Sequence, residues 1–241
     1  MPAKSYQLEV IGAVHIYKRR GTKHMRLSIA SDGKVKMTIP AWATYTAALE
    51  FAESRRQWIQ DNLPVCHVPL GQGQHIGKAH RLFFETADVP VPRSRIAGSE
   101  IRVSRPAAML ITHPEVQAAA SKAGIRALRL QAAKLLPGRL RQLAAQYGFT
   151  YTSVQVKQLK GRWGSCDSQQ RITLNLFLMQ LPWHLIDYVL LHELVHTKHM
   201  NHGPGFWQEF LRHEPRAKLY RAQIKSQQPT LKAIEAETAM A

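Results

Sequence analysis

Residues 192–196 read His-Glu-Leu-Val-His, and the predominantly apolar stretch that contains them begins at Leu185-Ile186. If this stretch is helical, His192 and His196 lie on one face of the helix, about 6 Å apart along its axis. Both imidazoles can then reach one metal ion while Glu193 lies beside it. This geometry is typical of the metal-binding helix of zinc hydrolases.

A catalytic zinc site uses three protein ligands and keeps one position for water, so a third ligand is expected nearby. The candidates are His199, His202 and Glu209. On a straight helix, His199 lies about 10 Å from His192, too far for two zinc–nitrogen bonds of about 2.1 Å. His202 follows the expected helix end, where the flanking asparagine and glycine can adopt the backbone angles of a chain reversal. We therefore predict His202 as the third ligand, with Glu209 as the alternative.

The ordinary interpretation of these histidines is a basic helix surface in a histidine-rich chain, because His184 and His213 also lie nearby. In that case Glu193 would be an unpaired carboxylate on a predominantly apolar helix. Burial of a carboxylate is costly unless a cation pairs with it. The sequence therefore favours a metal site over a solvated surface.

An ordered series of further motifs surrounds this pentapeptide. It comprises Lys160-Gly161-Arg162-Trp163-Gly164-Ser165-Cys166, Ile172-Thr173-Leu174-Asn175, Leu181-Pro182, Asp187-Tyr188-Val189 and Asn201-His202-Gly203-Pro204-Gly205-Phe206-Trp207. With the motif at 192–196, this series resembles the YgjP-like metallopeptidase family, and the N-terminal segments are similar to it as well. More distantly, His202-Gly203-Pro204 followed by Phe206 resembles the third-ligand segment of SprT- and Spartan-type proteases, which act on proteins crosslinked to DNA.

The resemblance implies a zincin fold, one Zn²⁺ per chain held by His192, His196 and His202, and Glu193 as the catalytic base. In such a site, zinc lowers the pKa of water toward about 7, and the glutamate carries a proton from the water to the leaving amine. The expected reaction is hydrolysis of a peptide bond in a protein or peptide substrate. Hydrolysis of a non-peptide bond is an alternative, because the motif specifies the metal chemistry more closely than the substrate.

Four residues outside the ligand set are candidates for orienting a ligand or binding substrate. Tyr188 lies one helical turn before the first motif histidine and Asp187 is next to it, so either can orient a ligand. The alternatives are packing for the tyrosine and charge complementarity with the helix end for the aspartate. The segment Trp163–Cys166, or the strand over 172–178, can bind substrate by strand addition, and the alternative for Trp163 is a place in the hairpin core. Arg162 can contact a substrate carboxylate or phosphate, or it is a solvated strand end.

The pattern of apolar residues predicts an α+β protein with two parts. Residues 1–108 form a β-rich N-terminal module with one helix, and residues 109–241 form a zincin-like metallopeptidase domain in which helices pack on a small mixed sheet. The first part is expected to contain a hairpin over 24–39 with its turn at 31–33, a helix over 44–62, and short strands over 81–85 and 100–103. The second is expected to contain a helix over 116–148, strands over 154–159 and 172–178, a helix from 182 to about 198, and a frayed C-terminal tail.

The chain carries a strong positive charge, with 33 lysines and arginines against 16 acidic residues in 241 and a formal net charge of +17. The basic residues are spread along the chain, and such a surface favours polyanionic partners. A nucleic-acid-binding protein with a structural or inactive zinc site is therefore the competing class of function. A protease that acts on nucleic-acid-bound proteins combines the two interpretations.

The cysteines and the hydropathy pattern indicate the cellular compartment of the protein. Cys66 and Cys166 are one hundred residues apart and match neither a disulfide framework nor a paired metal-ligand spacing. The sequence shows no signal peptide, and no apolar run approaches the ~18 residues of a membrane-spanning helix. We therefore expect a cytoplasmic protein that does not contact a membrane.

Overall fold

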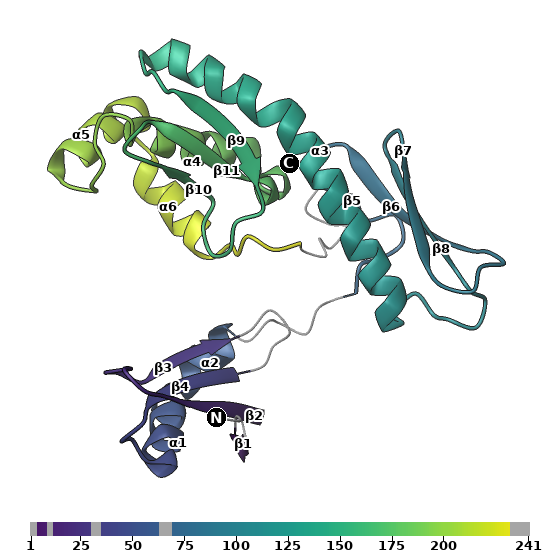
Figure 1. Ribbon diagram of the computed structural model, residues 1–241. Coiled ribbons are helices and arrows are strands. Elements are labelled where there is room, and N and C mark those ends of the chain that lie inside the picture. Colours follow the sequence, from purple (N-terminus) through teal and green to yellow (C-terminus); the bar gives the residue numbers. More distant parts are fainter. Residues whose placement is uncertain (1–3, 9–11, 30–34, 63–68, 232–241) are drawn as a thin grey trace. The chain divides into compact units, whose positions relative to one another are not determined.

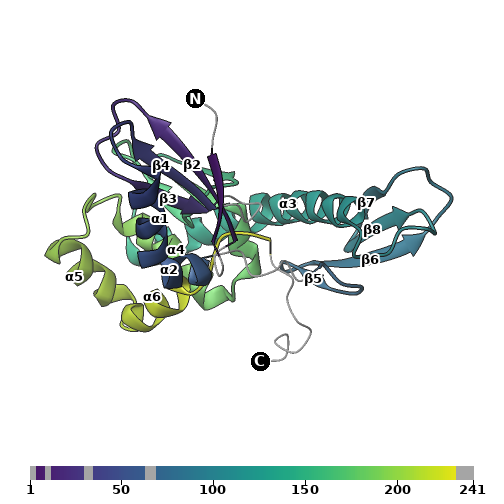
Figure 2. The same cartoon turned by 90° about the horizontal axis from the view of Figure 1, so that it is seen from below.

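A computed structural model describes residues 4–8, 12–29, 35–62 and 69–231. The chain divides into two compact units between residues 68 and 69, and Figures 1 and 2 show that both units contain a sheet and helices. This mixture confirms the predicted α+β class. Among the described residues, no helix combines the length and the apolar character that crossing a membrane requires.

The N-terminal unit is a four-stranded sheet with two helices. In chain order its elements are β1 (Lys4–Leu8), β2 (Gly12–Arg19), β3 (Arg26–Ile29), β4 (Val35–Pro40), α1 (Tyr45–Ser54) and α2 (Arg56–Asn62). The strand order is β1-β2-β4-β3, with β2 and β4 parallel and the other pairs antiparallel. Alternate strand residues such as Val14, Ile16 and Met37 are buried against Ala48 and Ala52 of α1, so the helices cover one face of the sheet (Figure 1).

Two predictions fall on this unit. The hairpin predicted over 24–39 is confirmed as the antiparallel β3–β4 pair, and its predicted turn at 31–33 lies outside the described residues. The single helix predicted over 44–62 is wrong, because the chain forms two helices that meet at Arg55. There the backbone N–H of Arg55 donates to the Ala52 carbonyl, three residues back, and φ reaches −108°. The apolar spacing continues across this break, which is why the periodicity alone did not reveal it.

The second unit begins with another four-stranded sheet that packs on a long helix. Its strands are β5 (His75–Ile76), β6 (His80–Thr86), β7 (Arg93–Ala97) and β8 (Glu100–Arg105), in the order β5-β6-β8-β7. The strands predicted over 81–85 and 100–103 are confirmed as β6 and β8. Leu82, Ile101 and Val103 share one core with α3 (Pro114–Tyr147), the long helix predicted over 116–148. The predicted boundary at residue 108 therefore lies inside this unit, at a change from sheet to helix within one core.

The remaining elements of this unit are β9 (Ser153–Lys157), β10 (Gly164–Cys166), β11 (Arg171–Asn175), the 3-10 helix η1 (Leu176–Gln180), α4 (Trp183–Val195), α5 (Pro204–His213) and α6 (Ala217–Lys225). Of these, β9, η1 and α4 pack against α3 (Figures 1 and 2). The three-stranded sheet has the order β10-β11-β9, with β11 parallel to β9 and antiparallel to β10. Because β11 is central, β10 is left at an edge.

Three element boundaries in this region differ from the predictions. The strand predicted over 172–178 ends at Asn175, whose side-chain Oδ1 accepts a hydrogen bond from the Phe177 N–H and starts η1. The alternation of apolar residues continues through 178, so the pattern concealed this change of backbone. The strand predicted over 154–159 ends at Lys157, and the helix predicted to reach about residue 198 ends at Val195.

Candidate metal centre

The helix α4 brings the first two histidines of the cluster together. His192 lies in the last turn of α4 and His196 caps its C-terminus, with the His196 N–H donating to the His192 carbonyl. The backbone therefore remains helical across the pair, and the spacing of four residues places both rings on one face. Their Nε2 atoms are 3.2 Å apart.

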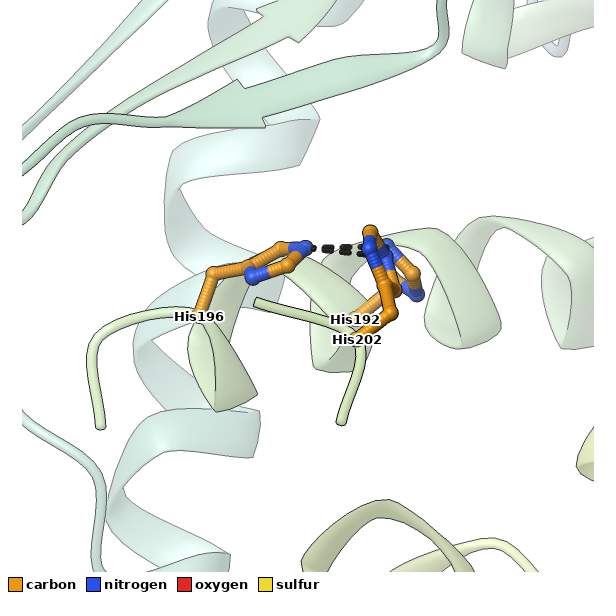
Figure 3. A group of neighbouring side chains, drawn as sticks. All are labelled: His192, His196 and His202. Atoms are coloured by element: carbon orange, nitrogen blue, oxygen red, sulfur yellow. Dashed lines mark hydrogen bonds between the residues drawn. The ribbon is translucent and has the colours of Figure 1, made fainter. Parts of the chain in front are cut away.

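His202 completes the cluster from the loop that follows α4. Gly203 is the N-cap of α5 with ordinary extended angles (φ −76°, ψ −177°), so the special backbone angles predicted for a reversal are not used there, and Pro204 begins α5, which packs against α4. His202 Nε2 lies 3.0 Å from His192 Nε2 and 3.2 Å from His196 Nε2, and Figure 3 shows the three rings converging. The three histidines thus form a group that could hold a metal ion.

The spacing of the three nitrogen atoms fits a tetrahedral metal site. Zinc–nitrogen bonds of about 2.0–2.1 Å at tetrahedral angles separate the ligand nitrogens by about 3.3 Å. The observed separations of 3.0 to 3.2 Å are close to that value. No arrangement of protons satisfies all three pairs of nitrogens as hydrogen bonds, whereas one bound cation would accept a lone pair from each nitrogen.

The protonation of the rings also suits metal binding. Burial, together with the smaller effect of the charges of His196, His202 and Arg221, lowers the pKa of His192 to about 3. Burial also lowers the pKa of His196, although the hydrogen bond to the His199 carbonyl opposes this shift. His196 Nδ1 lies 2.9 Å from that carbonyl oxygen, so the neutral ring carries its proton on Nδ1 and its lone pair on Nε2.

Phe206 in the first turn of α5 is the common support of the cluster. Its ring centroid lies 4.9 Å from that of His192 and 4.7 Å from those of His196 and His202. Phe206 is fully buried, so the ring limits the rotation of all three imidazoles. The sequence motif contained Phe206 but gave it no role. Its position two residues after Pro204, and so in the first turn of the helix that follows His202, was the signal that could have placed it near the cluster.

Glu193 is buried next to the cluster, with only 5% of its surface exposed. Burial raises the pKa of its carboxyl group to about 8, against the positive charge of Arg162, which lowers it. The carboxylate lies directly over Gly164 of β10, where a Cβ atom would come within 2.6 Å of Glu193 Oε1. Glycine at this position therefore gives the carboxylate its space, a requirement that sequence reasoning missed.

A cavity of about 280 Å³ joins the edge strand to the histidine cluster. Its lining residues are Gly164, Ser165, Cys166, His192, Glu193, His196, Met200 and His202. A buried carboxylate, three converging imidazoles and a strand edge thus face the same small space.

The other four predicted candidates are not among the residues that line this cavity. Both Asp187 oxygens accept hydrogen bonds of 2.7 Å from Arg139, which ties α4 to α3. Tyr188 is buried, with its ring centroid 6.2 Å from that of His192 and 5.2 Å from that of Phe210. Trp163 is half-buried against the main core, and Arg162 is exposed.

The two alternatives to His202 as third ligand lie outside the group. The Glu209 carboxylate pairs with Lys198, Arg212 and His213, which links the loop after α4 to α5. His199 contributes its backbone carbonyl to His196, and its ring lies beside Gly205. Both residues therefore contact the loop that carries His202.

Asn175 fixes the segment that leads into β10, and sequence reasoning gave it no role. Its side chain is fully buried and donates to the carbonyls of Leu159 and Arg162, at 3.0 and 2.7 Å. Its backbone N–H donates to the carbonyl of Trp163 at 2.9 Å. One residue at the end of β11 therefore holds the loop that delivers Gly164 to Glu193.

Comparison with known proteins gives the family. A family model described as YgjP-like, metallopeptidase domain, matches residues 23–227, and no curated protein matches the chain. The metallopeptidase zymogen abylysin of Pyrococcus abyssi matches with a TM-score of 0.36 and 26% identity, over 38% of this chain and 93% of that one. The metallopeptidase zymogen jannalysin of Methanocaldococcus jannaschii matches with a TM-score of 0.32 and 20% identity, over 36% and 89%. Because the family model spans most of the chain, including the histidine cluster and Glu193, this protein belongs to the YgjP-like metallopeptidase family.

Proposed function

We propose that this metallopeptidase is a zinc-dependent peptidase in which His192, His196 and His202 hold one Zn²⁺ and Glu193 is the general base. The observation that carries the proposal is the triangle of three Nε2 atoms beside a buried glutamate in one cavity. Neutral imidazoles are preferred zinc ligands, and three of them leave one coordination position for water.

Glu193 is suited to move a proton within this cavity. When bound, zinc supplies Lewis acidity that makes its water a nucleophile near neutral pH and stabilises negative charge on the substrate carbonyl oxygen. The Glu193 carboxylate accepts the proton of the attacking water and donates it to the leaving nitrogen. Burial keeps this carboxylate basic, and the contact with Gly164 fixes its position.

The edge strand β10 supports a mode of substrate binding. Among the described strands, β10 pairs with β11 alone, and all three of its residues line the cavity. An extended peptide that added to β10 would place its carbonyl groups along the cavity beside Glu193. We propose this strand addition as the way in which substrate is held.

The test of the reaction is hydrolysis of an unbiased library of fluorogenic peptides by the zinc-loaded protein. We expect Glu193→Gln to lower kcat by about 10²–10⁴-fold while the bound zinc remains, since this is what proton transfer by a positioned base contributes. Glu50→Gln, an exposed carboxylate on α1, is the matched control and should leave the rate unchanged. Equal rates for wild type and Glu193→Gln would contradict the proposed role of Glu193.

A separate variant tests strand addition. Trp163 immediately precedes β10, and Trp163→Ala should raise KM for peptides if this segment recognises substrate. A folded Trp163→Ala protein with unchanged peptide affinity would show that Trp163 only completes the core, as its half-buried position also allows.

A further inference from the structure

The strands of the N-terminal unit carry basic residues without acidic ones. The strands β1–β4 contain five lysines and arginines and no aspartate or glutamate. The segment between β2 and β3 adds Arg20 and Lys23, both exposed. The acidic residues Glu50 and Glu53 lie on α1, among the helices that cover the opposite face of the sheet. The strands thus carry positive charge and no carboxylate, whereas the helical side carries these two acidic residues together with Arg55 and Arg56.

Strand alternation sorts these basic residues between the two faces. Lys4 and Lys18 belong to the helical side, where each ammonium lies 4.8 Å from the centre of the Tyr45 ring. Arg19, Arg26 and Lys36 have the opposite parity to the buried strand residues and so face away from the helices. We call this second surface the open face. Its residues are His15, Tyr17, Arg19, Arg26, Lys36 and Thr38.

The register of the sheet arranges the open face around Tyr17. Tyr17 is directly opposite Thr38, which is in turn opposite Arg26, so these three form a row across β2, β4 and β3. His15 and Lys36 are opposite each other in the adjacent row. Neighbouring strands lie about 4.8 Å apart and alternate residues about 7 Å apart, so the cationic groups flank a central aromatic ring on two sides.

Tyr17 is half-buried although it does not contribute to the apolar core of this unit. A phenol ring at the centre of a basic sheet surface provides a stacking platform, because every nucleobase has a π-face that an aromatic ring can contact. The surrounding lysine and arginine side chains provide the positive charge that phosphate groups require.

The second unit offers a useful comparison, since β6, β7 and β8 also place an aromatic residue among arginines. There Phe83 is opposite Arg102, and Arg102 is opposite Arg95. Glu85 and Glu100, however, lie in the same sheet and both pair with Arg102. The charge on that sheet is partly neutralised by ion pairs, whereas the strands of the N-terminal unit contain no carboxylate.

We propose that the open face of the N-terminal unit binds single-stranded nucleic acid. A base stacks on Tyr17, and phosphates of the same strand pair with Arg26 and Lys36 on one side and Arg19 on the other. A single strand is favoured over a duplex because an unpaired base can turn its flat face onto the ring, which a base-paired stack prevents. This binding is independent of the histidine cluster, which lies in the other compact unit.

The test is fluorescence anisotropy of the full chain with 12-nucleotide oligo(dT), oligo(U) and a 12-base-pair duplex, starting at about 50 mM salt. Three phosphate contacts predict a slope of about −2 in a plot of log affinity against log salt for the single strands. Tyr17→Ala should weaken single-strand binding at least about five-fold, and Tyr17→Phe should retain it. The double variant Arg26→Gln/Lys36→Gln should reduce the steepness of the slope by about 1.4. The two single strands distinguish a DNA partner from an RNA partner.

Matched controls separate this site from the general charge of the molecule. Arg93→Gln/Arg95→Gln removes two exposed arginines from β7 in the second unit and should leave the affinity nearly unchanged. Circular dichroism confirms that each variant is folded. Absence of binding at 50 mM salt, or an equal loss in the β7 control, overturns the proposal. The proposal is also overturned if polyglutamate displaces the bound oligonucleotide and Tyr17→Ala keeps full affinity, because the open face would then bind an acidic protein.

Discussion

The buried glutamate illustrates how function conflicts with stability at single residues. Glu193 is almost completely enclosed, and its surroundings raise its pKa to about 8 in the absence of a cation. A neutral amide of the same shape would fit this position without that cost. The carboxylate is therefore explained by the chemistry proposed for the cavity rather than by packing.

A stability measurement on metal-stripped protein tests this cost. In the unfolded chain the carboxyl group ionises near pH 4.5, whereas in the folded protein its pKa is about 8. Between these values the folded state holds a proton that the unfolded state has lost, so stability falls as the pH rises. Glu193→Gln should therefore exceed wild type in Tm at pH 8, by a stability difference on the order of a few kcal/mol, and match it near pH 5. The same difference at both pH values would contradict the buried-carboxyl account.

Gly164 provides a second test at this scale. Gly164→Ala forces the Glu193 carboxylate to move, because the added Cβ would lie 2.6 Å from Oε1. A displacement of about 1 Å typically costs around 10²-fold in rate, so we expect kcat to fall by at least that factor while zinc content stays unchanged. Gly138→Ala, on an open side of α3, is the control and should leave kcat at its wild-type value. A fully active Gly164→Ala protein would mean that this contact is not needed for catalysis.

The three clustered histidines were easier to predict from the sequence than the residues that hold the surrounding groups in place. The spacing of His192, His196 and His202 is a local pattern, and the structure brings these three side chains together as expected. Gly164 and Asn175 act on groups that are distant along the chain, so no local pattern reveals them. The prediction for Asp187 illustrates the same limit, because its partner Arg139 comes from another helix.

At the scale of elements, one asparagine couples the central strand to the edge strand. Asn175 satisfies two carbonyls of the loop before β10 and starts the 3-10 helix that follows β11. This dual use explains why the apolar alternation over 172–178 was misleading. The pattern reports which side chains are buried, and it does not report where a buried polar side chain bends the backbone.

Removal of that side chain should affect both stability and activity. We expect Asn175→Ala to destabilise the protein by about 1–3 kcal/mol, because the substitution removes two hydrogen bonds that a fully buried side chain donates. Activity should fall as well, since the loop no longer holds β10 against Glu193. Gln155→Ala, an exposed residue of β9, should change stability by less than about 0.5 kcal/mol. Urea unfolding measures the stability of both variants. An Asn175→Ala protein as stable as the Gln155→Ala control would refute this account of the loop.

At the scale of the whole molecule, the division into units was the least predictable feature. The change from strand-rich to helix-rich sequence near residue 108 marks the start of α3, but the preceding sheet buries its apolar face against that same helix. The unit boundary lies between residues 68 and 69 instead. A boundary depends on which elements share a core, and that information is carried by contacts between distant residues.

The two units also divide the chemical features of the chain. The histidine cluster, Glu193 and the cavity belong to the second unit, and the acid-free basic sheet belongs to the first. A net charge of +17 is therefore not explained by the peptidase site alone. The peptidase proposal and the nucleic-acid proposal rest on separate residues, so each can fail without the other.

The most direct test of the metal centre is metal content by mass spectrometry on tag-free, folded protein, comparing wild type with Glu193→Gln and His202→Ala. The account predicts about one zinc per chain in wild type and in Glu193→Gln, and loss of that zinc in His202→Ala, because three protein ligands define the site. A folded wild-type protein that takes up no metal after zinc reconstitution would contradict it. So would full zinc retention in His202→Ala.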